Sequence, residues 1–177
     1  MSSDDLTLFS YEILGLVGRR GASAHDLRQM ERKGRILDWA GESQYYAEPK
    51  RLARLGYLEA RKEPGKTRER TVYTLTEKGV QALQDWGRTP LRFTPLKCEA
   101  ADRLLAADII GEDATRESFA ALREDLEDLR ERVHEMALSA ESLPHRTKYL
   151  RLGAVFLERI VDAHEQLVED VERELAP

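Results

Sequence analysis

Residues 43–75 carry the pattern that most restricts how this chain can fold. A short amphipathic segment ends at Gly56, and two strand-like runs with alternating polarity follow it, residues 57–61 and 71–75. A basic turn, residues 64–70, joins the two runs. A helix, a glycine stop and a hairpin in this order are typical of a recognition helix followed by a wing. The sequence therefore predicts a winged helix-turn-helix, a layout used to bind DNA.

Apolar residues at helical spacing predict two helices before this pattern and one after it. The first helix is marked by Phe9, Ile13, Leu16 and Val17, and the helix after the hairpin by Val80, Leu83 and Trp86. Ser23 and Asp26 resemble a capping box at the start of the second helix, and Thr76 is the expected N-cap of the last one. These helices complete the predicted module.

Pro49 disturbs the helix at the centre of the pattern. Ser43 is a typical N-cap residue, but a proline inside a helix removes one backbone donor and crowds the preceding turn, at a cost of about 3 kcal/mol. We therefore expect the regular helix to begin near Ala47, which puts Pro49 in its first turn. Leu52 and Leu55 then face the core.

Residues 89–95 are the expected boundary between two modules. Pro90 and Pro95 break helical periodicity and stiffen a linker. Beyond them nearly every segment has helical spacing. We expect a mainly α-helical protein with a small β-hairpin: a winged helix-turn-helix DNA-binding domain over residues 1–88 and an α-helical dimerisation domain over residues 96–177.

Apolar residues in the second module follow the spacing of a heptad seam. A seam of this kind needs a partner helix, and two long helices make only a thin core by themselves. A second copy is the economical way to bury the remaining apolar surface, so we expect a homodimer. The residues assigned to its contact are Phe119, Leu122, Leu126, Leu129, Val133, Met136, Phe156, Leu157, Ile160, Leu167 and Val171.

Charge is divided unevenly along the chain, whose net charge is −5. Residues 1–90 contain 16 Lys and Arg against 13 Asp and Glu, which gives +3, and residues 91–177 contain 12 against 20, which gives −8. Within residues 50–70 eight basic residues stand against three acidic ones, a local +5. Because a phosphate backbone meets the local field rather than the total charge, the acidic composition does not exclude nucleic acid.

Three runs of residues together resemble the PadR family of bacterial transcriptional regulators. They are residues 11–17 (YEILGLV), 43–58 (SQYYAEPKRLARLGYL) and 73–79 (YTLTEKG). The resemblance implies an N-terminal winged helix-turn-helix followed by a helical dimerisation domain. It also implies a regulator that acts as a repressor, as most members do, with release by a small aromatic compound as in some of them.

The expected DNA contacts follow from this layout, with the central helix in a major groove and the hairpin turn on the adjacent backbone. Tyr46 matches the family's tyrosine and is expected to donate to a phosphate. The full set is Ser43, Gln44, Tyr45, Tyr46, Lys50, Arg51, Arg54, Lys66, Thr67, Arg68 and Arg70. One short helix covers few base pairs, so two copies are expected to bind an inverted-repeat operator in double-stranded DNA.

A protein-interaction module is the alternative function, because winged helices also bind proteins without recognising a DNA sequence. Hairpins that bind proteins tend to expose apolar or aromatic residues. This turn instead carries Lys66, Thr67, Arg68 and Arg70. The basic turn therefore favours DNA over a protein partner.

Three aromatic residues are candidates for an effector site. Trp86 and Phe93 lie near the junction of the modules, and Phe156 lies on the last helix. Together they could line a pocket for a flat, small aromatic molecule. Aromatic residues at helical spacing also serve as core anchors, so the sequence leaves both interpretations open.

The residues give little support for catalysis or for a bound cofactor. The four histidines, His25, His134, His145 and His164, are scattered and form no pair at a spacing of four. Cys98 stands alone without an active-site motif, and no glycine-rich phosphate loop is present. We therefore expect no enzyme, no cofactor and no metal site.

The single cysteine also bears on the compartment, because it excludes an intrachain disulfide and indicates a reducing environment. The first residues lack the basic region of a signal peptide, and no apolar run approaches the roughly 18 residues that a membrane span needs. We expect a cytoplasmic protein without a membrane partner.

Overall fold

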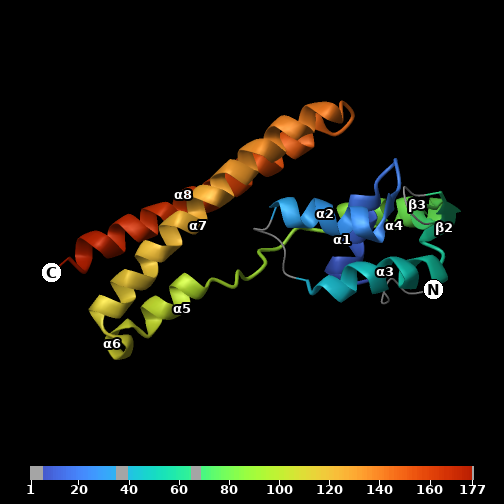
Figure 1. The fold of residues 1–177 in the computed structure, drawn as a ribbon. Helices are drawn as coiled ribbons and strands as arrows, with labels where there is room; N and C mark the ends of the chain where they lie inside the picture. The colour runs from blue at the N-terminus through green and yellow to red at the C-terminus, as the bar shows by residue number, and fades with distance from the viewer. Residues whose placement is uncertain (1–5, 35–39, 65–68, 177) are drawn as a thin grey trace. The chain divides into compact units, whose positions relative to one another are not determined.

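The computed structural model describes residues 6–34, 40–64 and 69–176, which divide into two compact units (Figure 1). Among these residues, unit 1 comprises 6–33, 40–64 and 69–92, and unit 2 comprises residue 34 together with 93–176. Residues 88–98 form neither helix nor strand. The expected fold class, mainly α-helical with a small β-hairpin, is confirmed.

Unit 1 combines helices with one small antiparallel sheet. Its elements are α1 (Leu8–Val17), β1 (Ala22–Ser23), α2 (Ala24–Gly34), α3 (Glu42–Arg54), β2 (Leu58–Glu63), β3 (Arg70–Leu75) and α4 (Glu77–Gly87). The order in the sheet is β1-β3-β2, and the predicted hairpin pairs Leu58 with Leu75 and Glu63 with Arg70. Strand β1 was not predicted, because two residues are too few to show a period.

The capping signals predicted at Ser23 and Thr76 are confirmed. Asp26 Oδ2 accepts hydrogen bonds from the backbone N–H of Ser23 at 2.9 Å and from its hydroxyl at 2.8 Å, while the N–H of Asp26 donates to Ser23 Oγ at 3.2 Å. At the start of α4, Thr76 Oγ1 accepts from the N–H of Gly79 at 3.1 Å. These bonds satisfy helix-end donors that have no partner within the helix.

The core of unit 1 lies between α1, α2, α3 and the sheet. Its larger members are Phe9, Ile13, Leu14, Val17, Leu27, Tyr45, Leu52, Tyr57, Leu58 and Tyr73. The stripe predicted for α1 is therefore confirmed, with Leu16 at its edge. The inner face predicted for α4 is only partly right: Leu83 packs against the core, but Val80 and Trp86 remain 41% and 40% exposed.

The start of α3 differs from the prediction. The helix begins at Glu42 rather than near residue 47, and its N-cap is Gly41 rather than Ser43. Gln44 Oε1 accepts a hydrogen bond from the N–H of Gly41 at 2.9 Å and so closes the helix end. Pro49 lies inside the helix with its ring fully buried. Packing of that ring against the core offsets the loss of the one backbone hydrogen bond that a proline cannot donate.

The end of α3 is a Schellman motif, which confirms the glycine stop. Gly56 has φ +78°, a conformation that glycine adopts without strain. The N–H of Tyr57 donates to the carbonyl of Leu52 at 3.0 Å, and the N–H of Gly56 donates to that of Ala53 at 3.0 Å. Tyr57 and Leu52 are both buried, as the apolar contact of this motif requires.

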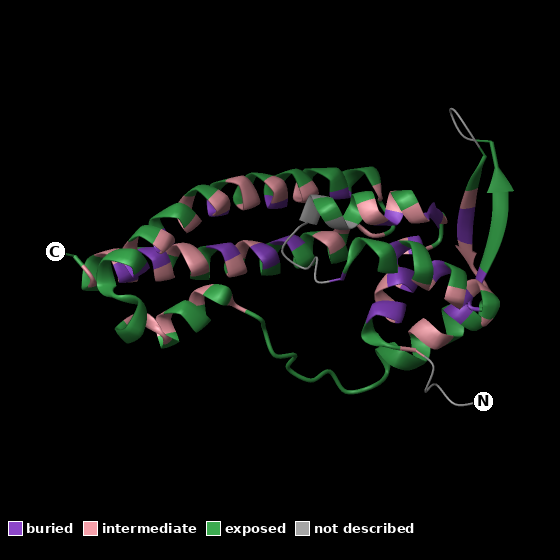
Figure 2. Ribbon diagram, turned by 60° about the horizontal axis from the view of Figure 1, so that its bottom comes forward, coloured by how far each residue is buried: buried purple, intermediate pink, exposed green. Residues whose placement is uncertain are grey.

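Unit 2 is a long helical hairpin with a short helical segment before it. Its elements are α5 (Glu99–Leu105), α6 (Ala107–Ile110), α7 (Glu112–Ser139), a 3₁₀ turn (Ala140–Ser142) and α8 (Thr147–Glu174). The two long helices lie side by side (Figure 1), and buried positions recur along both of them (Figure 2).

The predicted heptad seam is filled within one chain. Phe119, Leu126 and Val133 of α7 are at most 3% exposed because they pack on buried residues of α8, namely Leu157, Val161, Val168 and Val171. Leu122, Leu129, Met136, Ile160 and Leu167 are half-buried beside them. The buried members of the predicted set are therefore covered by a helix of the same chain, and a contact between two copies through the half-buried ones stays a prediction. Phe156 differs, since 55% of it is exposed.

Candidate nucleic-acid interface

Helix α3 presents one row of side chains to the core and another to solvent. Tyr45, Pro49 and Leu52 are buried. Glu42 and Gln44 are exposed in its first turn, and the exposed side chains that recur at helical spacing along the rest of the helix are Ser43, Tyr46, Ala47, Lys50 and Arg54, here called the outer row of α3. Residues three and four apart share a helix face, so the outer row is one continuous surface.

Tyr45 does not belong to this surface, contrary to the prediction. It is 0% exposed, and its ring makes an edge-to-face contact with Phe9, with the centroids 5.1 Å apart. Its hydroxyl donates to Glu12 Oε1 at 3.3 Å, and the guanidinium of Arg28 lies 5.3 Å from its ring centroid. A side chain enclosed in this way cannot contact DNA, so Tyr45 is a core residue.

Arg51 is also largely engaged inside unit 1. Its guanidinium holds both carboxylate oxygens of Glu48, at 2.9 and 2.8 Å, and donates to Ser10 Oγ at 3.0 Å. Hydrogen bonding from Arg51, together with that from Ser10, outweighs burial and lowers the pKa of Glu48. Arg51 therefore fixes α3 on α1, and a direct DNA contact would require breaking this network.

The wing is the hairpin of β2 and β3, and only part of its predicted contact set is described. Lys66, Thr67 and Arg68 lie outside the described residues. Arg70 opens β3 and is half exposed, and its guanidinium lies 3.5 Å from Asp26 and 3.8 Å from Glu63. Burial alone would raise the pKa of Asp26, but hydrogen bonds from Ser23 and the charge of Arg70 lower it.

The basic residues of β2 were absent from the predicted contact set. Every residue of β2 after Leu58 is exposed, so Arg61 and Lys62 both reach solvent beside the wing turn. Each forms a surface ion pair, Arg61 with Glu59 at 3.1 Å and Lys62 with Glu69 at 2.7 Å. The signal in the sequence was the run of charged residues at 61–63, which breaks the alternation expected of a half-buried strand.

The three aromatic residues predicted to line an effector pocket lie in different units. Trp86 belongs to unit 1, where its ring stacks on Tyr11 at a centroid distance of 4.7 Å and an angle of 7°. Phe93 and Phe156 belong to unit 2 and are 85% and 55% exposed. An effector pocket formed by these three residues therefore stays a prediction.

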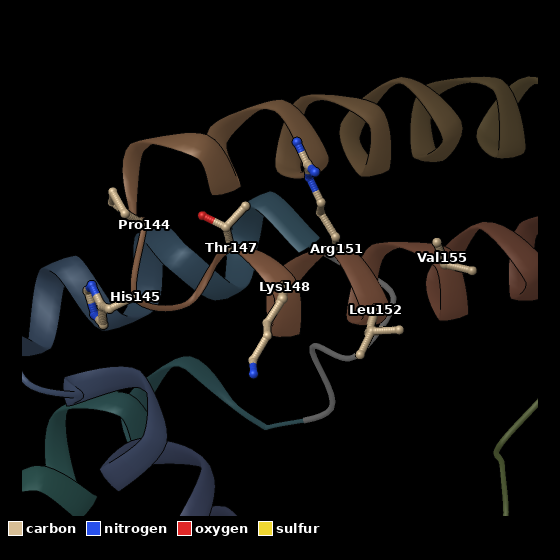
Figure 3. A pocket seen from close by; sticks show the side chains of 7 residues that line it. All are labelled: Pro144, His145, Thr147, Lys148, Arg151, Leu152 and Val155. Atoms are coloured by element: carbon tan, nitrogen blue, oxygen red, sulfur yellow. The ribbon is translucent and has the colours of Figure 1, made fainter.

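A cavity of about 580 Å³ opens at the turn between α7 and α8 (Figure 3). It contains none of the three predicted residues and is lined by Pro144, His145, Thr147, Lys148, Arg151, Leu152 and Val155. The side chains of Lys148 and Leu152 project to the same side of α8 (Figure 3). Arg151 is paired with Glu141 at 2.8 Å. The lining thus combines cationic groups with an apolar wall.

Unit 2 also brings together Cys98 and His164, a pair that the sequence analysis missed. Cys98 Sγ lies 3.5 Å from Nε2 of His164, whose Nδ1 donates to the carbonyl of Ile160 at 2.7 Å. The contact ties the start of α5 to α8. Within the described ranges, no group of three or more Cys, His, Asp or Glu residues could hold a metal ion. Among the same residues, no helix is both long and apolar enough to cross a membrane.

Several solved structures resemble this chain in fold over nearly all of its length. Bacillus subtilis PadR in complex with operator DNA matches with a TM-score of 0.69 and 24% identity, over 96% of this chain and 98% of that one. The chain has the PadR fold. The same protein in complex with p-coumaric acid matches with a TM-score of 0.61 and 22% identity, over 96% and 98% of the two chains.

A third structure with the PadR fold is the PadR-like transcriptional regulator BC1756 from Bacillus cereus. It matches with a TM-score of 0.67 and 15% identity, over 99% of this chain and 98% of that one. No sequence model of a protein family and no curated protein matches the chain. Both BC1756 and Bacillus subtilis PadR are described as transcriptional regulators. The expected winged helix-turn-helix followed by a helical unit is confirmed as a fold.

Proposed function

We propose that the protein is a DNA-binding transcriptional regulator that uses the outer row of α3 and the wing to bind an operator. The observation that carries this proposal is the outer row itself. Within the described part of the chain, Lys50 and Arg54 form no ion pair, so both charges are available to a phosphate or a base edge. The structural likeness to PadR bound to operator DNA supports the same function.

Binding to DNA from immediately upstream of the gene, compared with unrelated DNA of equal length, tests the proposal. The comparison covers about 50 to 300 mM salt, because phosphate contacts make affinity fall steeply with salt. We expect preference for the upstream fragment and a steep salt dependence. Equal, weak binding to both fragments, together with retention of a protein partner by unit 1, would instead favour the protein-interaction alternative.

We further propose that the regulator is a homodimer and that unit 2 is its dimerisation domain. The fully buried positions of the α7–α8 seam are covered within one chain, so exposed apolar side chains are better candidates for the centre of the contact. The first half of α8 exposes Tyr149, Leu152 and Phe156 to 61%, 70% and 55%, and these three residues form one stripe at helical spacing. Large apolar side chains exposed together are typical of a protein interface. A second copy covering this stripe would give a dimer with two copies of α3, and a two-fold dimer has the symmetry of an inverted repeat.

Sedimentation of a Leu152→Glu variant tests the dimer. A two-fold contact contains the position twice, so each dimer would bury two charges, and we expect the dissociation constant to rise at least about 100-fold. Ala121→Glu is the matched control, because Ala121 is exposed on α7 and does not belong to the proposed stripe. A wild-type protein that sediments as a monomer at micromolar concentration would contradict the homodimer.

An aromatic carboxylate is the effector class that the cavity of unit 2 favours. Lys148 and His145 would bind the carboxylate, while Leu152 and Val155 would cover the ring. The similarity to PadR in complex with p-coumaric acid supports this class of ligand. The cavity shares Leu152 with the proposed dimer stripe, so a bound acid would lie at the edge of the dimer contact and could weaken operator binding, as release of a repressor requires.

Titration with p-coumaric acid tests the effector site. We expect saturable binding that Lys148→Met weakens about tenfold or more, whereas Lys97→Met, which removes a lysine from the exposed segment before α5, leaves it unchanged. Equal binding by both variants would place the effector elsewhere, and Trp86→Leu would then test the aromatic pocket predicted from the sequence.

A further inference from the structure

Lys78, in the first turn of α4, reaches back to the end of α3. Its ammonium donates to the carbonyl oxygen of Leu55 at 2.7 Å and lies 4.1 Å from the ring centroid of Tyr57. Leu55 is the C-cap of α3. A cation at this position satisfies a carbonyl that has no partner within the helix and opposes the negative end of the helix dipole.

Thr76 holds the next two carbonyls of the same turn. Its hydroxyl donates to the carbonyl oxygens of Gly56 at 2.7 Å and Tyr57 at 3.0 Å, and its N–H donates to that of Tyr57 at 3.2 Å. The carbonyls of residues 55, 56 and 57 are therefore all bound by residues 76 and 78. These contacts are here called the α4 clasp.

Gly79 sets how closely α4 approaches this turn. A Cβ atom at position 79 would lie 2.2 Å from the carbonyl oxygen of Tyr57, a distance that no side chain can adopt. The glycine is required by the close approach of two backbones rather than by its own dihedral angles. The clasp thus depends on three positions close together in the sequence, Thr76, Lys78 and Gly79.

The clasped turn is the direct covalent link between the proposed recognition helix and the wing. Only residues 55–57 separate α3 from β2. A small rotation in this turn would move the outer row of α3 relative to the β2–β3 hairpin. The helix and the hairpin could then no longer fit the major groove and the adjacent DNA backbone at the same time. The Schellman bonds hold the turn from the side of α3, and the α4 clasp holds it from the opposite side.

We propose that Lys78 is a positioning residue for operator recognition, which fixes the angle between α3 and the wing without itself contacting DNA. This inference rests on the proposed DNA-binding function. A positioning role differs from a phosphate contact in what removal of the side chain would change. A changed angle lowers affinity for the operator alone, whereas removal of a phosphate contact lowers affinity for every sequence and reduces the salt dependence.

The test compares Lys78→Met, which keeps the aliphatic stem over Tyr57, with Lys78→Arg, which keeps the charge. We expect Lys78→Met to weaken operator binding about tenfold while binding to unrelated DNA and the slope of log K against log salt stay at the wild-type values. Lys78→Arg should restore most of the operator affinity. Arg92→Met is the matched control, because it also removes one positive charge from unit 1 but lies outside the clasp, α3 and the wing.

Hydrogen exchange of the free protein tests whether Lys78 holds the clasped turn, independently of whether the protein recognises an operator. The amides of residues 55–57 should exchange faster in Lys78→Met than in the wild type or in Arg92→Met, at a temperature where all three proteins are folded. A slope reduced by about 0.9 with equal losses of affinity on both DNAs would overturn positioning in favour of a phosphate contact. Wild-type operator affinity in Lys78→Met would overturn it outright. A wild-type protein without any DNA preference would instead refute the proposed function, and unchanged exchange would then refute the clasp separately.

Discussion

The hydroxyl of Ser10 donates a 2.7 Å hydrogen bond to Oε1 of Glu48, and this bond joins α1 to the middle of α3. Ser10 is fully buried, and its oxygen also accepts from Arg51. The bond sets the rotation of α3 about its own axis, because Glu48 lies on the flank between the buried row and the outer row. Which side chains face solvent therefore depends on a polar contact as well as on apolar packing.

Replacing Glu48 with Gln should lower the free energy of unfolding by about 1 to 2 kcal/mol at neutral pH, because a charge-assisted network loses its anion. Hydrogen bonds from Arg51 and Ser10 lower the pKa of Glu48 below its ordinary value of 4.5. The carboxylate therefore stabilises the fold above pH 4.5, and this contribution disappears as the pH falls through the lowered pKa.

Thermal unfolding of the wild type and of Glu48→Gln between about pH 3 and pH 7 measures this effect. The stability difference should be largest at neutral pH and shrink toward the acidic end. If the stabilities of the two proteins change with pH in the same way over the whole range, Glu48 makes no such contribution.

Tyr45 and Tyr46 are neighbours in sequence with opposite roles. Tyr45→Ala should lower the free energy of unfolding by about 3 to 5 kcal/mol, since it empties a fully enclosed aromatic site. Tyr46, 37% exposed, should tolerate alanine within about 0.5 kcal/mol but lose DNA affinity. Denaturant unfolding and DNA titration of both variants separate the two effects. The opposite pattern would mean that the outer row of α3 has been assigned to the wrong face.

The sequence could not distinguish these two tyrosines, and the reason is physical. Helical periodicity predicts which residues of a helix share a face. It can be applied only to residues that are known to lie within the helix, so it depends on where the helix begins. Pro49 indicated a helix beginning near residue 47, so residues 43–46 fell outside the expected period. Burial of the proline ring allows the helix to begin at Glu42 instead. The hairpin, the caps at Ser23 and Thr76 and the glycine stop were predictable because each depends on a few adjacent residues.

The helical hairpin of unit 2 shows a different limit. A heptad seam indicates that a helix has a partner, but not whether the partner belongs to the same chain. Here Val133 and Leu157, on α7 and α8, pack in one intrachain cluster. The turn of residues 140–146 decides this, because it is short enough to bring α8 back along α7.

Gly79→Ala should destabilise unit 1 by about 2 kcal/mol or more, because the added methyl group would overlap the carbonyl oxygen of Tyr57. Gly15→Ala is the matched control. Gly15 lies within α1, and a Cβ there would meet no atom within 4 Å, so alanine should be neutral or stabilise the helix by up to about 1 kcal/mol. Urea unfolding measures both, and equal effects would show that close approach is not the reason for Gly79.

Arg70→Ala tests the wing with little effect on the fold. The ion pairs of Arg70 with Asp26 and Glu63 are long, at 3.5 and 3.8 Å, and half exposed, so they contribute at most about 1 kcal/mol and can be exchanged for a phosphate. Removing Arg68 and Arg70 together should weaken binding to operator and unrelated DNA by the same factor. The slope of log K against log salt should fall by about 0.9 for each phosphate that is no longer neutralised. Titrations at several salt concentrations check this, and a slope equal to that of the wild type would exclude both arginines from the DNA contact.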